Sequence, residues 1–206
     1  MSINAKLGAV LFALTTLLGC TKEEDPNKVY DIVLNNGKTK LTLKIPYAYV
    51  DWGSRLPEGE DRLVRVNFSY PSMRPTQSRV AEDSVSLIII LEPNPNLTRS
   101  NIALNSILRD MKTPTRLPPR YVGKEGVFDI YTTQDFQTNA VKKEYFTHDQ
   151  LGNLLNFREQ PGLRSHGNRP YANALDLRYG FDPSLQGNQL EVDRAVTALI
   201  DQWLQK

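Results

Sequence analysis

Residues 85–91 read Val-Ser-Leu-Ile-Ile-Ile-Leu, a nearly continuous run of β-branched and aliphatic side chains. A strand with one wet face alternates apolar and polar residues, whereas a strand covered on both faces is apolar throughout. The run therefore predicts a central strand of a sheet that is covered on both sides. Pro93 and Pro95 follow closely. Because proline cannot donate a hydrogen bond to a sheet, they mark the end of this strand.

The segments before this run have the pattern of half-buried strands. Residues 40–45 alternate Lys-Leu-Thr-Leu-Lys-Ile, which predicts one buried and one exposed face. They follow a strand-like segment at residues 29–34 and the sequence Asn-Asn-Gly at residues 35–37, which is a strong hairpin signal. Residues 62–70 alternate in the same way. This part of the chain is therefore predicted to form antiparallel sheet.

The second half of the chain continues the strand pattern and ends in a helix. Strands are predicted at residues 126–131, 143–146, 154–157 and 172–181, with a hairpin loop at residues 148–153 and a short helix at residues 101–111. Residues 190–204 place their apolar side chains at helical spacing. We therefore expect an α+β fold, predominantly antiparallel sheet, with a C-terminal amphipathic helix packed on it.

The domain organisation follows from the same pattern. Residues 29–206 are predicted to form a single α+β domain, since their length is sufficient for one hydrophobic core. Residues 113–119 contain three prolines and have the composition of a connector. Two half-domains, at about residues 29–112 and 120–206, are therefore the alternative.

The N-terminus has the pattern of a secretory signal. An apolar run at residues 7–18 follows Lys6 and ends in Leu17-Leu18-Gly19-Cys20. The run is too short to cross a bilayer, which needs about 20 apolar residues, so it indicates a cleaved signal peptide. The four residues at its end resemble the lipobox of bacterial lipoproteins. An ordinary cleaved signal with a coincidental cysteine is the alternative.

The lipobox resemblance implies where the mature protein is held. In that family the cysteine thiol receives a diacylglycerol, the peptide is cut before it, and the new amino terminus is acylated, with palmitate among the acyl groups. Residues 1–19 would then be the signal peptide, Cys20 the lipidated first residue, and residues 20–28 a charged tether. Thr21, in place of Asp after the cysteine, implies the outer membrane, with the domain facing the periplasm.

Composition excludes several classes of function. Cys20 is the single cysteine, so a disulfide, a zinc–thiolate site and a cysteine nucleophile are excluded from the folded domain. The net charge is +2 and no block of five or six like charges occurs, which argues against nucleic-acid binding. The sequence thus favours an envelope protein with another kind of partner.

A search for catalytic patterns finds few reactive residues. The chain has two histidines: His148 belongs to the predicted hairpin loop, and His166 lies in residues 164–169, which are predicted to be a loop. No G-x-S-x-G elbow, H-E-x-x-H helix, calcium loop or phosphate-binding loop occurs in the sequence. We expect no catalytic residue, no metal and no cofactor. A carboxylate pair that cleaves glycosides stays open, because its separation depends on the fold.

Two segments are rich in the residue types that dominate protein interfaces, namely Tyr, Trp, Met and Arg. One follows the strand at residues 40–45, and the other follows the strand at residues 62–70. The predicted partner-binding residues are Tyr49, Trp52, Arg55, Tyr70, Met73 and Arg74. The alternative is that the aromatic side chains of the first segment pack in the core.

A second resemblance concerns the whole mature chain. Besides the lipobox, it rests on I-P-Y-A-Y at residues 45–49, V-N-F-S-Y-P-S-M at 66–73, L-R-Y-G-F-D-P-S-L at 177–185 and V-D-R-A-V-T-A-L-I-D-Q-W at 192–203. These features resemble the periplasmic immunity lipoproteins that accompany type VI secretion effectors, including those that protect against phospholipases. The resemblance implies a toxin as protein partner and no catalytic residues. The alternatives are an envelope assembly or structural lipoprotein and an envelope hydrolase.

Overall fold

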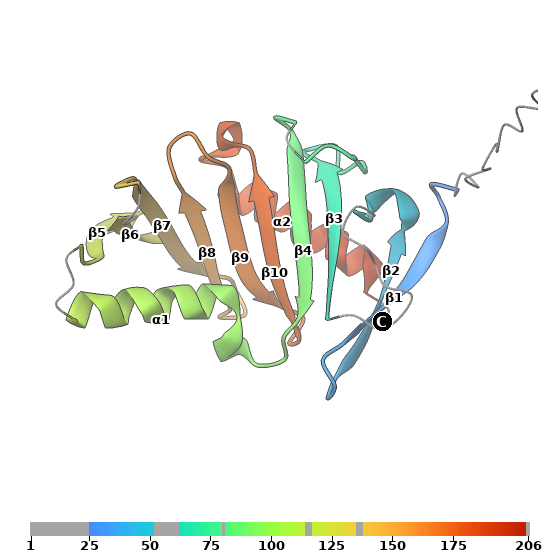
Figure 1. Cartoon of the computed structure of the whole chain (residues 1–206), viewed down its shortest axis with the longest axis horizontal. Coiled ribbons are helices and arrows are strands. Elements are labelled where there is room, and N and C mark those ends of the chain that lie inside the picture. The colour runs from blue at the N-terminus through green and yellow to red at the C-terminus, as the bar shows by residue number, and fades with distance from the viewer. Residues whose placement is uncertain (1–24, 52–61, 80, 114–116, 135–137, 205–206) are drawn as a thin grey trace, which may run out of the picture.

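The computed structural model describes residues 25–51, 62–79, 81–113, 117–134 and 138–204. Within them the chain forms ten strands and two α-helices (Figure 1). The strands are β1 (Val29–Asn35), β2 (Lys40–Pro46), β3 (Leu63–Ser69), β4 (Ser84–Leu91), β5 (Arg120–Glu125), β6 (Phe128–Gln134), β7 (Val141–His148), β8 (Leu154–Glu159), β9 (Ser165–Tyr171) and β10 (Leu175–Phe181). The helices are α1 (Arg99–Lys112) and α2 (Gln189–Trp203), and a short 3-10 turn, η1 (Tyr47–Tyr49), follows β2.

Eight of these strands form one sheet. Their order is β3-β4-β10-β9-β8-β7-β6-β5, and all neighbours are antiparallel. β1 and β2 form a separate two-stranded hairpin, as the Asn-Asn-Gly sequence predicts. The pairing of β4 with β10 joins strands from the two halves of the chain within one sheet. The predicted α+β class with a predominantly antiparallel sheet is confirmed.

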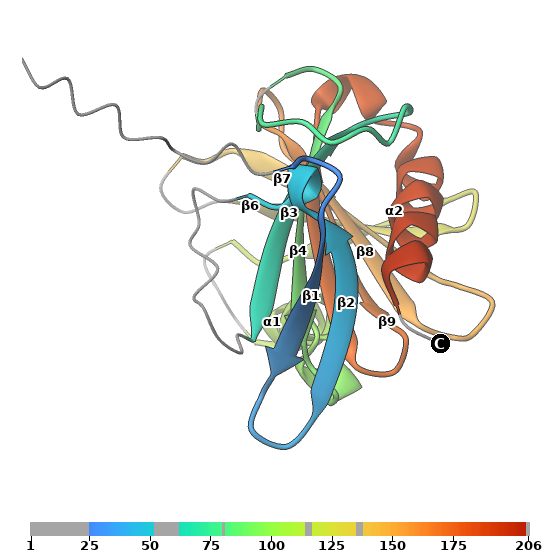
Figure 2. The same cartoon turned by 90° about the vertical axis from the view of Figure 1, so that its right-hand side faces the viewer.

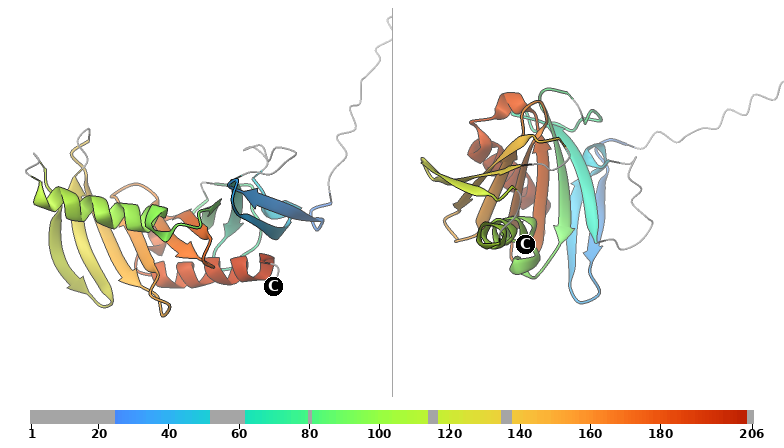
Figure 3. Two further views of the ribbon diagram at one scale, coloured as in Figure 1. Left: turned by 90° about the horizontal axis from the view of Figure 1, so that it is seen from below. Right: turned by 60° about the vertical axis from the view of Figure 1, so that its left-hand side comes forward.

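The two helices lie on opposite faces of the sheet (Figures 2 and 3). On one face, α2 packs on β3, β4, β10 and β9, as predicted for the C-terminal helix. On the other face, α1 contacts β8 and β9. Ile107 of α1 packs there against Phe146 and Leu154. Both residues lie near the strand ends that the β7–β8 loop joins. Among the described residues, no α-helix lies over the opposite strand ends on this face (Figure 1).

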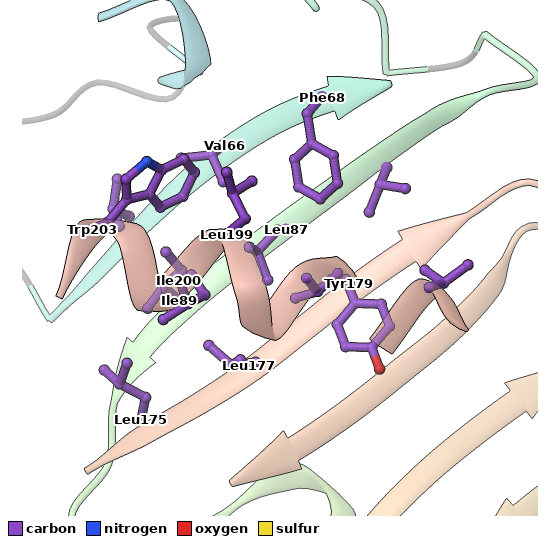
Figure 4. Packing of buried hydrophobic residues seen from close by; sticks show 14 of the residues in the cluster. Val66, Phe68, Leu87, Ile89, Leu175, Leu177, Tyr179, Leu199, Ile200 and Trp203 are labelled. Atoms are coloured by element: carbon purple, nitrogen blue, oxygen red, sulfur yellow. The ribbon is translucent and has the colours of Figure 1, made fainter. Parts of the chain in front are cut away.

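The main core lies between α2 and the sheet (Figure 4). The core includes Val66 and Phe68 of β3, Leu87 and Ile89 of β4, Leu175, Leu177 and Tyr179 of β10, and Leu199, Ile200 and Trp203 of α2. All of these side chains are buried. Residues that lie opposite each other on adjacent strands point to the same face of the sheet. The apolar residues of neighbouring strands therefore form one continuous surface.

The prediction for residues 85–91 is right about the strand and only partly right about its surroundings. β4 is second from the edge of the sheet, and α2 covers one of its faces. On the other face Ile90 is buried, but Ser86 and Ile88 are half-exposed. The second face of β4 is therefore only partly covered, although its sequence is as aliphatic as that of a strand in a sheet interior.

One strand was predicted to be a loop. Residues 164–169 are polar and contain a glycine, yet residues 165–169 belong to β9, which lies between β8 and β10, and only Arg164 lies outside the strand. The reason is tertiary. A Cβ atom on Gly167 would lie 2.2 Å from Cε2 of Tyr179, so the absent side chain lets the tyrosine ring lie across the neighbouring strand. The predicted strand at residues 172–181 starts later, at Leu175, because Ala172 and Asn173 adopt positive φ in a turn.

Candidate interaction surfaces

The two predicted partner-binding segments meet in the structure. The hydroxyl of Tyr49 donates a 2.7 Å hydrogen bond to the carbonyl of Met73. The Tyr49 ring packs edge-on against Trp203 with centroids 5.2 Å apart. Tyr70 and Met73 pack against the same core, whereas Arg74 is exposed. The structure thus gives Tyr49, Tyr70 and Met73 a packing role, and partial burial raises the pKa of Tyr49.

Further contacts hold these two segments together. Arg79 forms an ion pair with the buried carboxylate of Asp51. The side-chain amide of Gln77 donates to the carbonyl of Ala48 at 3.4 Å. Because these contacts join the loop after β3 to the turn after β2, the segments behave as one surface element. Of the other predicted site residues, Cys20, Trp52 and Arg55 lie outside the described residues.

A buried ionic cluster attaches α2 to the sheet. Asp193 of α2 accepts a 2.5 Å hydrogen bond from Arg169 of β9 and a 2.6 Å bond from the hydroxyl of Tyr179. Arg169 also pairs with Asp149, which organises the loop after β7 by accepting from the backbone of Leu151. Burial raises the pKa of Asp193, although Arg169 opposes this shift. Both carboxylate oxygens of Asp193 are occupied, so the cluster serves to orient α2.

A cleft lies beside this cluster on the α2 side. It has a volume of about 630 Å³ and lies between α2 and the loops after β5 and β7. Its apolar wall includes Leu155 and Leu190, and its rim carries Val127 and Leu151, which are 63% and 87% exposed. The cleft could take an apolar side chain, but its described residues offer no feature that selects one occupant.

The face opposite α2 carries a polar row that crosses five strands. The strand registers place Ser86, Gly180, His166, Arg158 and Glu144 side by side on β4, β10, β9, β8 and β7. Glu144 is buried and accepts a 2.5 Å bond from Nε of Arg158 and a 2.9 Å bond from Asn156. A buried carboxylate is stable only with such partners. Glu144 thereby fixes the position of the Arg158 guanidinium.

Two more arginines are fixed on the same face. Arg178 pairs with the fully buried carboxylate of Asp176 at 2.7 Å. Asp176 also accepts from the backbone N–H of Arg99 at 3.2 Å, so β10 supplies the carboxylate at the N-terminus of α1. Arg164 binds neutral groups: it donates to the hydroxyl of Ser84 at 3.1 Å and to the Ser84 and Gly180 carbonyls at 2.5 and 2.9 Å. Partial burial lowers the pKa of Arg164.

His166 lies among these cations. Partial desolvation and the positive charges of Arg158, Arg164 and Arg99 lower the pKa of its imidazole from the ordinary 6.5. The imidazole and Arg164 flank Gly180, since a Cβ built there would lie 3.6 Å from Nδ1 of His166 and 3.8 Å from Nε of Arg164. We call Arg99, Arg158, Arg164, Arg178 and His166 the arginine cluster.

A second cleft opens where α1 meets the arginine cluster. Its volume is about 310 Å³. The charged lining residues are Arg99, Asp110, Lys142, Glu144 and Arg158, and the apolar ones include Ile102, Ala103 and Ile107 of α1. This side of the molecule therefore combines fixed charges with a small apolar recess, which is the composition of a protein-binding surface.

The described residues contain neither a group of metal-binding side chains nor a helix able to cross a membrane. Among residues 25–51, 62–79, 81–113, 117–134 and 138–204, no group of three or more His, Cys, Asp or Glu side chains is placed to hold a metal ion. In the same part of the chain, no helix has both the length and the apolar character needed to cross a membrane.

Comparisons with known proteins assign no family. No protein-family model matches the sequence, and no curated protein matches it. Among solved structures, the chain is similar to a crystal structure of a protein of unknown function from Pseudomonas aeruginosa. The match has 13% sequence identity and a TM-score of 0.26, and it covers 81% of this chain and 94% of the other. A similarity at this level carries no functional argument.

The arginine cluster was not predicted from the sequence. Its members come from α1, β8, β9 and β10 and from the segment before β9, and no two of them form a recognisable motif. Only the strand register shows that Arg158 and His166 are direct neighbours. The available signal was the density of arginine and asparagine in residues 156–178, which is unusual for strands that are otherwise buried.

Proposed function

We propose that this chain is a non-enzymatic, lipid-anchored protein of the bacterial envelope that binds and neutralises a secreted toxin. The observation that carries the proposal is Leu17-Leu18-Gly19-Cys20, which ends an apolar segment of signal-peptide length. Several acyl chains on Cys20 would anchor the protein stably. An anchor at the attacked membrane raises the effective concentration of the inhibitor where the toxin acts. We place the domain on the periplasmic side of the outer membrane.

The surfaces of the domain support a protein as the partner. Fixed arginines and a shallow cleft lie on one side of the sheet, and Arg74 is exposed beside the packed tyrosines on another. Arginine and tyrosine contribute strongly to protein interfaces because they bury large areas and form directed hydrogen bonds. Phospholipases are the toxin class that the sequence resemblance favours, since such enzymes attack the membrane to which this protein would be anchored.

The anchor is tested with Cys20→Ala. Cells that make the wild-type chain should incorporate labelled palmitate into it and retain it in the membrane fraction. The variant should incorporate no label, and any cleaved product should be released into the soluble periplasm. A cleaved, unlabelled wild-type protein that stays on the membrane would contradict this part of the proposal.

Neutralisation is tested in cells that direct a secreted effector, encoded beside this protein, to the periplasm. The wild-type chain should restore growth, and the lipidated protein in neutral detergent should bind the effector directly. Cys20→Ala should protect less well at equal expression, because its local concentration at the membrane is lower. Failure to bind or protect against any neighbouring effector would overturn the proposal. Co-purification with envelope assembly proteins instead would favour a structural lipoprotein.

A further inference from the structure

The arginine cluster lies on the half of the sheet face that α1 leaves uncovered. Ile107 of α1 packs against Phe146 and Leu154, near one end of β7 and β8. Arg158 is near the other end of β8, and His166 is its cross-strand neighbour on β9. In the cluster, Arg99 and His166 are exposed and the three other arginines are partly exposed. The helix α1 borders the strands that carry them on one side (Figure 1).

The charges of this face do not cancel. Its two buried carboxylates each have an arginine: Glu144 holds Arg158, and Asp176 holds Arg178. The Arg164 guanidinium donates its hydrogen bonds to a hydroxyl and two backbone carbonyls, which carry no net charge. The carboxylate of Asp182 offsets part of the Arg164 charge. The four arginines of the cluster are thus set against three carboxylates, those of Glu144, Asp176 and Asp182, and one positive charge remains. An incoming anion would therefore gain from an interaction that the free protein does not already make.

The arginines are also held in place before any partner arrives. Arg158 and Arg178 have side chains that are 30% and 38% exposed, and each is fixed by a carboxylate beneath it. A side chain that is already ordered loses little entropy on binding. The planar guanidinium offers paired N–H groups that match the two oxygens of a carboxylate. The ordered arginines of this face thus have the chemistry that carboxylate groups require.

We infer that the arginine cluster binds an acidic segment of a partner protein, with Asp or Glu side chains placed over Gly180 between Arg164 and His166. This inference rests on the proposed function, because it gives the toxin an acidic contact region. The adjacent cleft would take apolar side chains of the same segment against Ile102 and Ile107. A flat membrane surface fits less well, since α1 packs on the same face beside the cluster and rises above the sheet there (Figure 1).

The test measures binding of a labelled octaglutamate peptide to the full lipidated protein in neutral detergent. We expect binding that weakens as salt rises, while an octaglutamine peptide does not bind. The double variant Arg99→Gln with Arg164→Gln should weaken binding roughly tenfold or more, because two favourable charges are lost. The matched control removes two exposed cations elsewhere, Arg194→Gln with Lys124→Gln, and should bind as the wild type does.

A measurement on the wild-type protein does not depend on variant folding. Addition of octaglutamate should shift the NMR signals of the His166 imidazole and leave those of His148 unchanged. Equal shifts of both histidines, or none, would overturn the inference. So would equal losses of binding in the two double variants.

Two competing ligands separate an acidic segment from other anions. Inorganic phosphate at equal charge, and vesicles of anionic phospholipid, should compete poorly with the peptide for the wild-type protein. Phosphate that competes as well as the peptide would show a general anion site, and vesicles that compete as well would show a membrane-facing surface. Either result would overturn the inference.

The inference and the proposed function can fail separately. If the arginine double variant still binds and neutralises its toxin as the wild type does, the inference is wrong and the proposed function stands. If the peptide binds as described but no effector is neutralised, the proposed function is wrong and the acidic preference of the surface stands.

Discussion

The two faces of the eight-stranded sheet have opposite chemistry although the same strands build both. Leu87 and Ile89 of β4 and Leu177 and Tyr179 of β10 point to the α2 face, where every one of them is buried. The intervening residues point to the α1 face, where Asp176 and Arg178 of β10 carry charge and Ile88 of β4 is half-exposed. Because side chains alternate along a strand, one face can provide stability while the other remains free for recognition.

The strongest test of this division compares two aliphatic residues on neighbouring strands. Leu177→Ala on the α2 face should lower the free energy of unfolding by about 2–5 kcal/mol, because it leaves a cavity in a fully buried core. Ile88→Ala on the α1 face should cost less than about 1.5 kcal/mol, since Ile88 is half-exposed. Urea denaturation measures both values. Equal losses would show that the α1 face is packed as tightly as the core.

A glycine substitution on each face gives a second comparison, for which we expect a smaller difference in stability than for the aliphatic pair. Gly167→Ala should destabilise the protein by about 1–3 kcal/mol, because the new methyl group would overlap the Tyr179 ring. Gly180→Ala should change stability by no more than about 0.5 kcal/mol, since its nearest neighbour would be 3.6 Å away, an ordinary contact distance. Thermal unfolding followed by circular dichroism should separate the two variants. A neutral Gly167→Ala would mean that Tyr179 can leave its position freely.

The smallest effect concerns pH and the α1 face. The pKa of His166 in the folded protein is below the ordinary 6.5, so the unfolded chain binds the proton more readily. Stability from this residue is therefore fully present above pH 6.5 and is lost as pH falls through the lower folded pKa. Unfolding free energies measured between pH 7.5 and 5 should fall more for the wild type than for His166→Gln. Parallel curves for the two proteins would contradict this role of the surrounding arginines.

The sequence was sufficient to predict an element where its local hydrophobic pattern matches its packing in the folded protein. The apolar run at residues 85–91 forms β4, and the helical spacing at residues 190–204 forms α2. Both elements bury their apolar side chains in the same core, so the spacing of these residues in the sequence already indicates which face of each element is buried. The hairpin at residues 35–37 was also predictable, because Gly37 adopts the positive φ that such turns require.

Other elements depend on neighbours that the local pattern does not reveal. β9 has a polar sequence with Gly167 and Pro170, and its strand conformation is stabilised by pairing with β10 and by cover from Tyr179. β5, with a mostly exposed sequence, was not predicted at all. Such strands are stabilised by pairing with residues far away in the chain. The intrinsic strand propensity of their own residues is therefore a weak guide to their conformation.

The predicted interface residues illustrate the same limit for function. Tyr49 and Met73 were expected to face a partner, and their contact with each other could not be foreseen from positions 24 residues apart. The arginine cluster was not foreseen either, since its existence depends on which face each strand residue takes. The composition thus indicated which kinds of side chain are available for binding a partner. Their positions on the surface follow from the strand register, which the sequence does not show.

The pairing of β4 with β10 also determines when the core can form during folding. Ile89 lies opposite Leu177, so the centre of the core needs a strand from near the end of the chain. Contacts between residues so distant in sequence form slowly, because a long loop must close first. A chain that emerges with its N-terminus first, from a ribosome or from a translocon, cannot complete this core until β10 has emerged. Folding of this domain is thereby deferred until most of the chain is free.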